Sequence, residues 1–599
     1  MNRNGTQAGR TAGRWVLAAW ALGCVWTAAA RGAVETWKDS STSGYWADSS
    51  ENRWYRFDDG WDVRRPDLAT GQWNYDGTKN ANVIVFANGV QATMTVNNLG
   101  GAEYQVNQLW FSNSTSRTIG QTDGSYLKLS GSSAKIESAS GSGTGTYTFN
   151  VALLLAATTE LNPVAGNLVF NGAITNGGYW INVYGASQKT LTLGGVLSGS
   201  GGVAVKQDSI VALTNNNAFT GAIWVEKGTL QAGTHTNAIG QSGIVNVGTN
   251  ATLDLQYGAA SVRPAALNLY GTGTNASWGA LRKSTSGATD WRGDVTLGAD
   301  ARMALPSGGF NLYGNVAAGG YTLYVTNAST FTMQSGGTMS GTKTTGDGAL
   351  RKSGSGTFIL RPASGLTGSV FVDQGELRQS DDNSSTLPSG GLLAMSNGTT
   401  YSSSGTGGRT IAKAARLDGN VTLASSASYL GPLTFSGNVD LNAGQRTLTM
   451  SYTNTIGGVV SNGGLTKAGS GLLILTGENT YALGTLIGAG VLQVGNNGTA
   501  GALPGNVTNN SALTFYRSDA TTFGGVISGT GALTNRAGTL TLSGTSTYSG
   551  NTVVAAGTLL VSGSIGSSAG VAVSGGATLA GAGTVGAVTM ASGATISPG

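Results

Sequence analysis

One pattern recurs four times along this chain, at residues 203–232, 350–379, 465–495 and 533–562. In each copy an aromatic residue or leucine stands nine positions before a glycine, and a leucine stands two positions after it. Lysine or asparagine occupies an early position of each copy (Lys206, Lys352, Lys467 and Asn535), and the recurrent glycines are Gly228, Gly375, Gly490 and Gly557. Nearly every other residue is exchanged between copies. The repeat therefore fixes the positions of apolar residues and of one glycine. It does not fix the position of any reactive group.

The spacing within a copy predicts short β-strands. In the last copy Leu540 and Leu542 alternate with Thr539 and Thr541, and a period of two residues is typical of a half-buried strand. A second short strand ends just before the recurrent glycine, and a third begins just after it. We therefore predict that the four glycines form structural corners, where a positive φ would disfavour any residue with a Cβ atom.

A single copy cannot bury its apolar face, whereas stacked copies bury a continuous core. The composition agrees, since 98 residues are glycine, 40% are hydrophobic and 10% are charged, while disorder requires low hydrophobicity with high charge. Almost no window beyond the leader has the apolar period of a helix. The sequence predicts an all-β protein, a right-handed parallel β-helix (β-solenoid) over residues 111–599, with an aromatic-rich cap at its N-terminal side.

Residues 1–33 are predicted to be a signal peptide. Arg10 and Arg14 precede an apolar run over residues 15–30, which ends in a cleavage motif formed by Ala28 and Ala30. The chain is therefore expected to be secreted or displayed at the cell surface. No second apolar segment follows, so no transmembrane segment is expected. The single cysteine, Cys24, lies in the leader, where it is either part of the apolar core or a lipid attachment site.

Residues 34–110 form the predicted cap region and are rich in aromatic residues. Five tryptophans lie between Glu35 and Tyr75, namely Trp37, Trp46, Trp54, Trp61 and Trp73. Their rings either close the end of the solenoid or provide a stacking platform for carbohydrate, since aromatic rings with a few polar groups suit a flat, hydroxyl-rich ligand. We favour the cap.

A second candidate surface stands four residues before the corner glycines, on the side that points away from the core. Its members are Trp224, Phe371, Leu486 and Val553. Apolar side chains at a repeated register could form a stripe for ligand binding or lateral association. Alternatively, loops cover them, or the assignment of inside and outside is shifted by one residue there. Both interpretations remain open.

Catalytic groups are sparse. Acid–base cleavage of polysaccharides needs carboxylates from neighbouring turns to lie together, but Asp381 and Asp382 stand in a Ser/Asn-rich loop, and Asp373 and Glu376 flank a corner. The only histidine, His235, has no second histidine or mature cysteine to share a metal site. We expect no enzyme, no metal and no cofactor. The formal net charge of +5 includes the arginines of the leader, so nucleic acid is not expected as a partner.

The run from lysine through the glycine corner to Leu-x-Val resembles the autotransporter-associated β-strand repeat, also called the passenger-associated transport repeat. The resemblance is strongest at 465–495 and 533–562. It implies a secreted or surface-displayed β-helical passenger of a bacterial envelope with a structural or adhesive role, whose partner could be a surface polysaccharide or the surface of a host or neighbouring cell. The alternative is a β-helical protein that degrades or binds polysaccharide. Because the sequence stops in repeat-like "ASGATISPG", we expect a truncated C-terminus.

Overall fold

The fold was analysed in a computed structural model, which describes residues 34–37, 81–86, 93–95, 103–111, 116–121, 124, 126–138, 145–233, 235–256, 260–262, 266–275, 277–334, 337–361, 365–380, 387–423 and 431–599. Within these ranges every regular element is a β-strand, and the strands pair in parallel with the strand one turn away. The predicted all-β parallel solenoid is confirmed. The chain divides into two compact units, Met1–Gln256 and Tyr257–Gly599, and each is described by itself.

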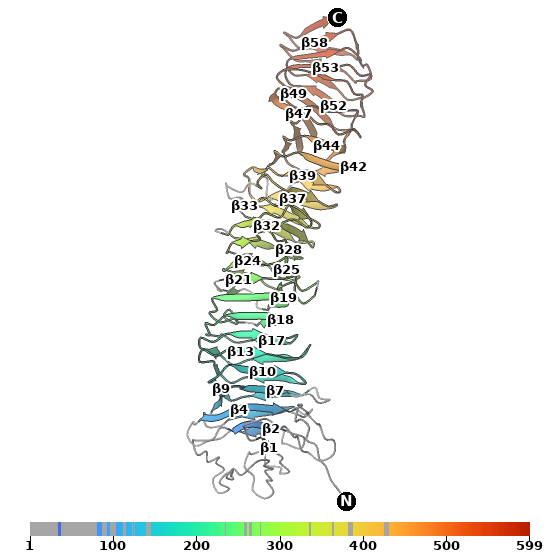
Figure 1. The fold of residues 1–599 in the computed structure, drawn as a ribbon. Helices are drawn as coiled ribbons and strands as arrows, with labels where there is room; N and C mark the ends of the chain where they lie inside the picture. The colour runs from blue at the N-terminus through green and yellow to red at the C-terminus, as the bar shows by residue number, and fades with distance from the viewer. Residues whose placement is uncertain are drawn as a thin grey trace, which may run out of the picture. The chain divides into compact units, whose positions relative to one another are not determined.

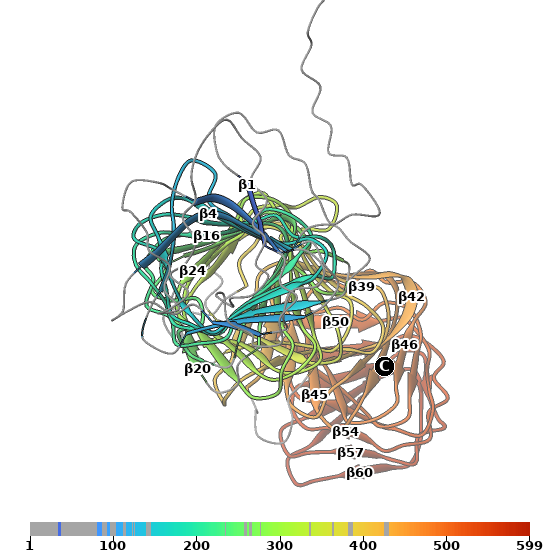
Figure 2. The same cartoon turned by 90° about the horizontal axis from the view of Figure 1, so that it is seen from below.

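The first unit contains three stacks of strands (Figure 1). Its first stack comprises β1 (Val34–Trp37), β2 (Ala81–Phe86), β4 (Glu103–Phe111), β7 (Lys135–Ser138), β10 (Thr159–Pro163), β13 (Ile181–Val183), β16 (Val203–Val205), β18 (Ile223–Ala232) and β19 (Ile244–Leu255). The second comprises β3 (Thr93–Thr95), β5 (Arg117–Gly120), β8 (Thr146–Phe149), β11 (Asn167–Phe170), β14 (Thr190–Leu193) and β17 (Ile210–Leu213). The third comprises β6 (Tyr126–Leu129), β9 (Ala152–Leu155), β12 (Ile174–Thr175) and β15 (Leu197–Ser198). Seen along the stacks, these turns superpose around one outline (Figure 2).

The second unit repeats this plan. Its first stack comprises β22 (Leu281–Lys283), β25 (Ala301–Leu305), β28 (Leu323–Asn327), β31 (Leu350–Ser353), β34 (Val370–Val372), β36 (Leu392–Met395), β39 (Ala414–Leu417) and the starts of β42 (Val439–Thr449) and β44 (Val460–Ala468). The second comprises β20 (Ala260–Val262), β23 (Thr289–Trp291), β26 (Phe310–Leu312), β29 (Phe331–Met333), β32 (Thr357–Leu360), β35 (Glu376–Gln379), β37 (Thr399–Ser403), β40 (Val421–Leu423), the ends of β42 and β44, β46 (Thr485–Ile487), β48 (Val507–Asn509) and β51 (Ile527–Ser528).

The remaining strands of the second unit form four groups. One is β21 (Ala266–Leu269), β24 (Asp294–Leu297), β27 (Val316–Ala317), β30 (Met339–Gly341) and β33 (Gly365–Leu366). The third stack is β38 (Arg409–Ile411), β41 (Leu433–Phe435), β43 (Asn454–Ile456), β45 (Leu472–Leu475), β47 (Val491–Gly498), β49 (Ala512–Arg517), β52 (Ala532–Asn535), β54 (Thr552–Val554), β57 (Val571–Val573) and β60 (Val588–Met590). The last two are β50 (Ala520–Phe523), β53 (Thr539–Leu542), β55 (Thr558–Val561), β58 (Thr578–Gly581) and β61 (Thr595–Pro598), and the pair β56 (Ser564–Ile565) and β59 (Thr584–Val585).

The core consists of ladders of like side chains. Leu473, Leu492, Leu513 and Leu533 stand opposite one another in successive turns and are fully buried. Aromatic rings stack in the same way, since the Phe149 and Phe170 rings are 4.4 Å apart and the Phe331 and Phe358 rings 4.6 Å apart. Parallel in-register pairing brings equivalent positions of successive turns together, so the alternation in the sequence becomes a continuous apolar interior.

Candidate functional site

The four repeat corners share one backbone geometry. The φ angles of Gly228, Gly375, Gly490 and Gly557 are 79°, 70°, 68° and 71°. A Cβ atom at Gly490 would lie 2.4 Å from the carbonyl oxygen of Gly471 and 2.5 Å from that of Gly469. These positions therefore need both the positive φ and the close approach of the preceding turn, which only glycine permits without strain.

A buried lysine completes two of these corners. Lys467 is fully buried, and its Nζ donates hydrogen bonds to the carbonyl oxygens of Ala468 at 3.1 Å, Gly469 at 2.6 Å and Ala489 at 2.9 Å. Ala489 directly precedes Gly490 in the next turn. The ammonium group thus joins the corner carbonyls of two successive turns, which satisfies its three donors.

At the equivalent position, the other three copies have a lysine or an asparagine with different hydrogen-bond partners. Lys352 is also fully buried and donates to the carbonyl oxygens of Ser353, Gly354 and Gln374. Asn535 donates through Nδ2 to the carbonyl oxygens of Ala556 and Thr558. Lys206 is instead half-buried and forms an ion pair with Glu226.

Burial lowers the pKa values of the corner lysines because desolvation disfavours the charged form. The pKa of Lys352 and that of Lys467 fall to about 8, as does that of Lys413, which donates to the carbonyl oxygen of Gly390 at 2.6 Å. The sequence showed that lysine recurs at an early position of three copies, but this position was assigned no role. The fixed position in the repeat was a signal, but burial became visible only when the turns were in register.

The three candidate association residues of the second unit do not come together in one stripe. Trp224, on β18 of the first unit, is 43% exposed. In the second unit Phe371 lies on β34 in the first stack, Leu486 on β46 in the second, and Val553 on β54 in the third. Each of these three side chains is half-buried between two inward-pointing neighbours. They point outward, but from three different stacks.

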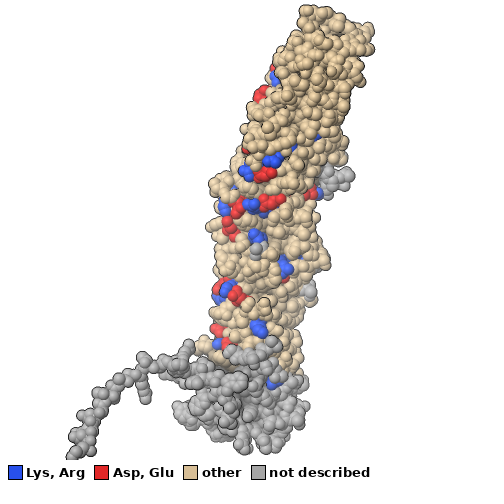
Figure 3. Space-filling model, turned by 90° about the vertical axis from the view of Figure 1, so that its right-hand side faces the viewer, with Lys and Arg blue, Asp and Glu red and all other residues tan. Residues whose placement is uncertain are grey.

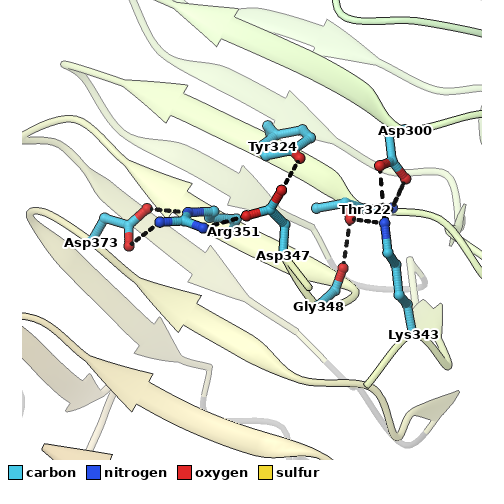
Figure 4. A network of polar contacts seen from close by, with 8 residues as sticks. All are labelled: Asp300, Thr322, Tyr324, Lys343, Asp347, Gly348, Arg351 and Asp373. Carbon is cyan, nitrogen blue, oxygen red and sulfur yellow. Dashed lines mark hydrogen bonds and ion pairs between the residues drawn. The ribbon is translucent and has the colours of Figure 1, made fainter. Parts of the chain in front are cut away.

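A connected group of polar side chains lies on the second unit (Figure 4). Lys343 Nζ lies 2.9 Å from Asp300 Oδ2 and donates to Thr322 Oγ1 at 2.8 Å, and Thr322 in turn donates to the carbonyl oxygen of Gly348 at 2.7 Å. These contacts hold the segment between β30 and β31 against the preceding turns.

The other half of this group is centred on Arg351. Its Nε donates to Asp373 Oδ2 at 2.6 Å and its Nη1 to Asp347, which also accepts a 2.6 Å hydrogen bond from the Tyr324 hydroxyl. That hydrogen bond, together with the arginine, lowers the pKa of Asp347. Burial and the neighbouring Asp347 raise the pKa of Tyr324 to about 12. The Asp347 carboxylate is thus held ionised by partners within the protein, as in a structural ion-pair network.

Other acids are paired in the same manner. Asp373 contacts Arg351, whereas Glu376 contacts Arg378 and Ser402, so these two carboxylates face different partners. On the face drawn in Figure 3 acidic and basic side chains lie beside one another, and the surface toward the C-terminal end is almost uncharged. Residues 450–599 carry only Lys467, Glu478, Arg517, Asp519 and Arg536 as charged side chains.

Several candidate residues lie outside the described ranges. These are the signal peptide with Cys24, the cap tryptophans Trp46, Trp54, Trp61 and Trp73, and the acids Asp381 and Asp382. Trp37 ends β1, of which only the backbone is described. His235 is an exposed loop residue. Among the described residues there is no cluster of histidine, cysteine, aspartate or glutamate suited to a metal ion. The same residues include no helix long and apolar enough to cross a membrane.

Comparison with known proteins agrees with the repeat geometry. The passenger-associated transport repeat family matches residues 209–232, 350–378, 465–494 and 537–561, which fall within the four predicted copies. The class defined by fold and repeats is therefore a parallel β-solenoid. This chain contains four segments that match the passenger-associated transport repeat.

One curated relative is "Adhesin BmaC autotransporter" of Brucella suis biovar 1 (strain 1330). The two chains are 34% identical over 151 residues, which is 23% of this chain and 4% of the relative. This chain thus spans a small fraction of the relative's length. No solved structure matches it significantly.

Proposed function

We propose that this chain is a surface-displayed or secreted bacterial passenger with an adhesive role. The observation that carries the proposal is the 34% identity to an autotransporter adhesin over 151 residues, in a chain with four passenger-associated transport repeats. A solenoid suits this role because stacked turns present long, repetitive surfaces while each turn needs only its neighbours for stability.

The proposed role is binding rather than catalysis. The carboxylates of Asp300, Asp347 and Asp373 form ion pairs with lysine or arginine. A general acid or base instead needs a carboxyl group able to exchange its proton with a substrate. The predicted signal peptide supports export, which an adhesive protein requires.

Bead attachment tests the adhesive role. The purified chain is coupled to inert beads, and attached beads are counted on a monolayer of cultured epithelial cells. We expect several-fold more attachment than with beads that carry the same chain after irreversible unfolding. Equal attachment of the folded and unfolded chains would overturn the proposal.

A further inference from the structure

We propose that one face of the first unit binds a neutral polysaccharide, which deepens the adhesive function proposed above. The face, here called the tryptophan face, is formed by the outward side chains of β4, β7, β10, β13, β16 and β18. Its principal members are Trp110, Lys135, Glu137, Glu160, Tyr184 and Trp224. Figure 1 shows β4, β7 and β10 lying one above another in the blue to cyan part of the ribbon.

Parallel register brings these side chains into two adjacent columns. Trp110 stands opposite Glu137, and Lys135 opposite Glu160. Further along the same columns, Tyr184 follows β13 and Trp224 lies on β18. Between Trp110 and Trp224 lie five strand spacings, or about 24 Å at ~4.8 Å each. A ligand that contacts both rings has to be an extended chain of several sugars.

The Trp110 ring is held in place by its neighbours, and the Trp224 ring is open to solvent. The Trp110 indole N–H donates to Gln108 Oε1 at 2.9 Å, and Lys135 Nζ lies 5.0 Å from the centre of a Trp110 ring. Trp224 is 43% exposed, and neither its indole N–H nor the Tyr184 hydroxyl bonds to a described residue. Preorganised rings with free polar groups are suited to stack on sugar rings and bond their hydroxyls.

A fourth ring is fixed by a glycine. The Trp180 ring lies against Gly202 so closely that a Cβ atom there would stand 2.6 Å from Trp180 Cζ3. Trp180 occupies the position just before β13, so its ring adds to the same face. Gly202 leaves room for this ring, whereas any larger side chain would displace it.

Two carboxylates provide hydrogen-bond acceptors beside the rings. Asn162 Nδ2 donates at 3.2 Å to Oε2 of Glu137 and at 3.2 Å to Oε2 of Glu160, and Lys135 Nζ lies 3.4 Å and 3.6 Å from the same two atoms. The Oε1 atoms of both glutamates bond to no described residue. Each is thus oriented through one oxygen and able to accept a sugar hydroxyl through the other.

Charge selects among polysaccharides. Lys135 lies between two glutamates, and Lys206 is paired with Glu226. The face therefore has an excess of negative over positive charge and has no cation that lacks a carboxylate partner. An anionic polysaccharide would meet repulsion without a compensating ion pair. A neutral polysaccharide meets none, because its hydroxyls need only hydrogen bonds and stacking.

The test is titration calorimetry with the full chain and neutral oligosaccharides: cellohexaose, xylohexaose, mannohexaose and maltohexaose, with their monosaccharides and hexagalacturonate for comparison. At least one neutral hexasaccharide should bind, its monosaccharide should not, and hexagalacturonate should bind more weakly. Trp224→Ala should lower the affinity about ten-fold or more, and Glu160→Gln should also weaken binding. The matched control Tyr321→Ala removes a ring that is 41% exposed on the second unit and should change nothing.

Binding of no neutral hexasaccharide, preference for the anionic one, or equal affinity of Trp224→Ala and the unaltered chain would overturn the inference. Bead attachment separates this result from the adhesive function. If beads attach while no glycan binds and Trp224→Ala attaches equally well, only the tryptophan face is refuted. If a glycan binds in the expected manner while beads do not attach, the inference stands and the adhesive function fails.

Discussion

At the corner after β46, the backbone of Gly490 lies within contact distance of Gly469 and Gly471 in the preceding turn. The ammonium group of Lys467 closes the same corner from inside by donating to three carbonyl oxygens. A buried ammonium is unfavourable unless its donors are satisfied, and backbone carbonyls that turn inward likewise need donors. The glycine lets the two turns approach closely, and the lysine supplies hydrogen bonds to the carbonyl oxygens of the same corner. This shared role explains why the two residues recur together in the repeat.

Gly490→Val should destabilise this corner by at least about 1–3 kcal/mol, because a β-branched residue would be forced to positive φ against two carbonyl oxygens. Hydrogen exchange of β45 and β47, followed by mass spectrometry, reports the loss. The matched control is Gly498→Val, since a Cβ at Gly498 meets nothing within 4 Å. Equal exchange in the two variants would refute a steric role for the Gly490 corner.

Lys467 should make stability depend on pH in alkaline solution. Its pKa is about 8 in the folded chain and about 10.4 in the unfolded chain. The unfolded state therefore holds more protons between these values, so the free energy of unfolding rises with pH across this window. Below about pH 8 both states are charged and this contribution is constant.

Lys467→Met removes this titration and leaves the three carbonyl oxygens without their donor. The variant should be less stable, and the difference in unfolding free energy from the unaltered chain should widen between about pH 8 and pH 10. This difference is measured by denaturant titrations in which hydrogen exchange of β45 and β47 reports unfolding. A difference that shrinks as the pH rises would mean that the carbonyl oxygens raise the pKa of the ammonium group instead.

At the scale of the strands, each element depends on the strand above it and the strand below it. Leu492 on β47 lies between Leu473 on β45 and Leu513 on β49, and all three are fully buried. The segment between β30 and β31 is held through the polar contacts of Lys343 and Asp347. We therefore expect the strands to be sensitive to the loss of buried leucines, and the segment between β30 and β31 to be sensitive to pH.

Leu492→Ala should cost about 2–5 kcal/mol because it leaves a cavity between two turns. Since turns stabilise only their neighbours, exchange should accelerate in β45, β47 and β49 while β31 and β34 stay protected. Leu483→Ala, at a residue 62% exposed, is the control and should have little effect. Uniform acceleration across the second unit would contradict nearest-neighbour stabilisation.

The segment before β31 should be sensitive to acid. The pKa of Asp347 is lowered in the folded state, so its stabilisation is complete above the ordinary aspartate value and is lost as pH falls through the lowered one. Hydrogen exchange of residues 342–349, corrected for its intrinsic pH dependence, should therefore accelerate only in strong acid. In Asp347→Asn the ion pair is absent at every pH, so that acid step should disappear. If the acid step were unchanged in this variant, the step would have to arise from another carboxylate.

Among the described residues several acids lie beside a lysine or an arginine, and the last 150 residues of the chain hold only five charged side chains. This distribution suits a surface that binds through shape, hydroxyls and rings rather than through a strong field.

If the proposed adhesive role excludes catalysis, the purified chain should leave pectin, alginate and xylan uncleaved in the presence of calcium, since cleavage of a glycosidic bond needs a pair of carboxyl groups placed as acid and base. Release of reducing ends is the measurement. Reproducible release that Asp381→Ala with Asp382→Ala abolishes would make the chain an enzyme. The paired variant Asp347→Ala with Asp373→Ala serves as a control for the loss of two acids elsewhere.

The sequence by itself determined the fold class and the repeats. Alternation such as that of Leu540 and Leu542 decides which residues face the core, and a recurrent glycine such as Gly490 marks the corner. Both are local properties, because strand periodicity and the preference for positive φ depend on a few neighbouring residues. Local patterns of this kind could be read for the strongest copies without knowing where each turn lies in space.

Only the tertiary structure decided which side chains share a face. Phe371, Leu486 and Val553 hold equivalent positions in their repeats but lie in different stacks, because turns of unequal length separate the copies: Leu473 pairs with Leu492, whereas Phe331 pairs with Phe358. Conversely, Trp110, Glu137 and Glu160 belong to no recognisable copy, yet register brings them together. Register depends on the sum of all preceding turn lengths, which is a non-local quantity, and a repeat pattern alone does not contain it.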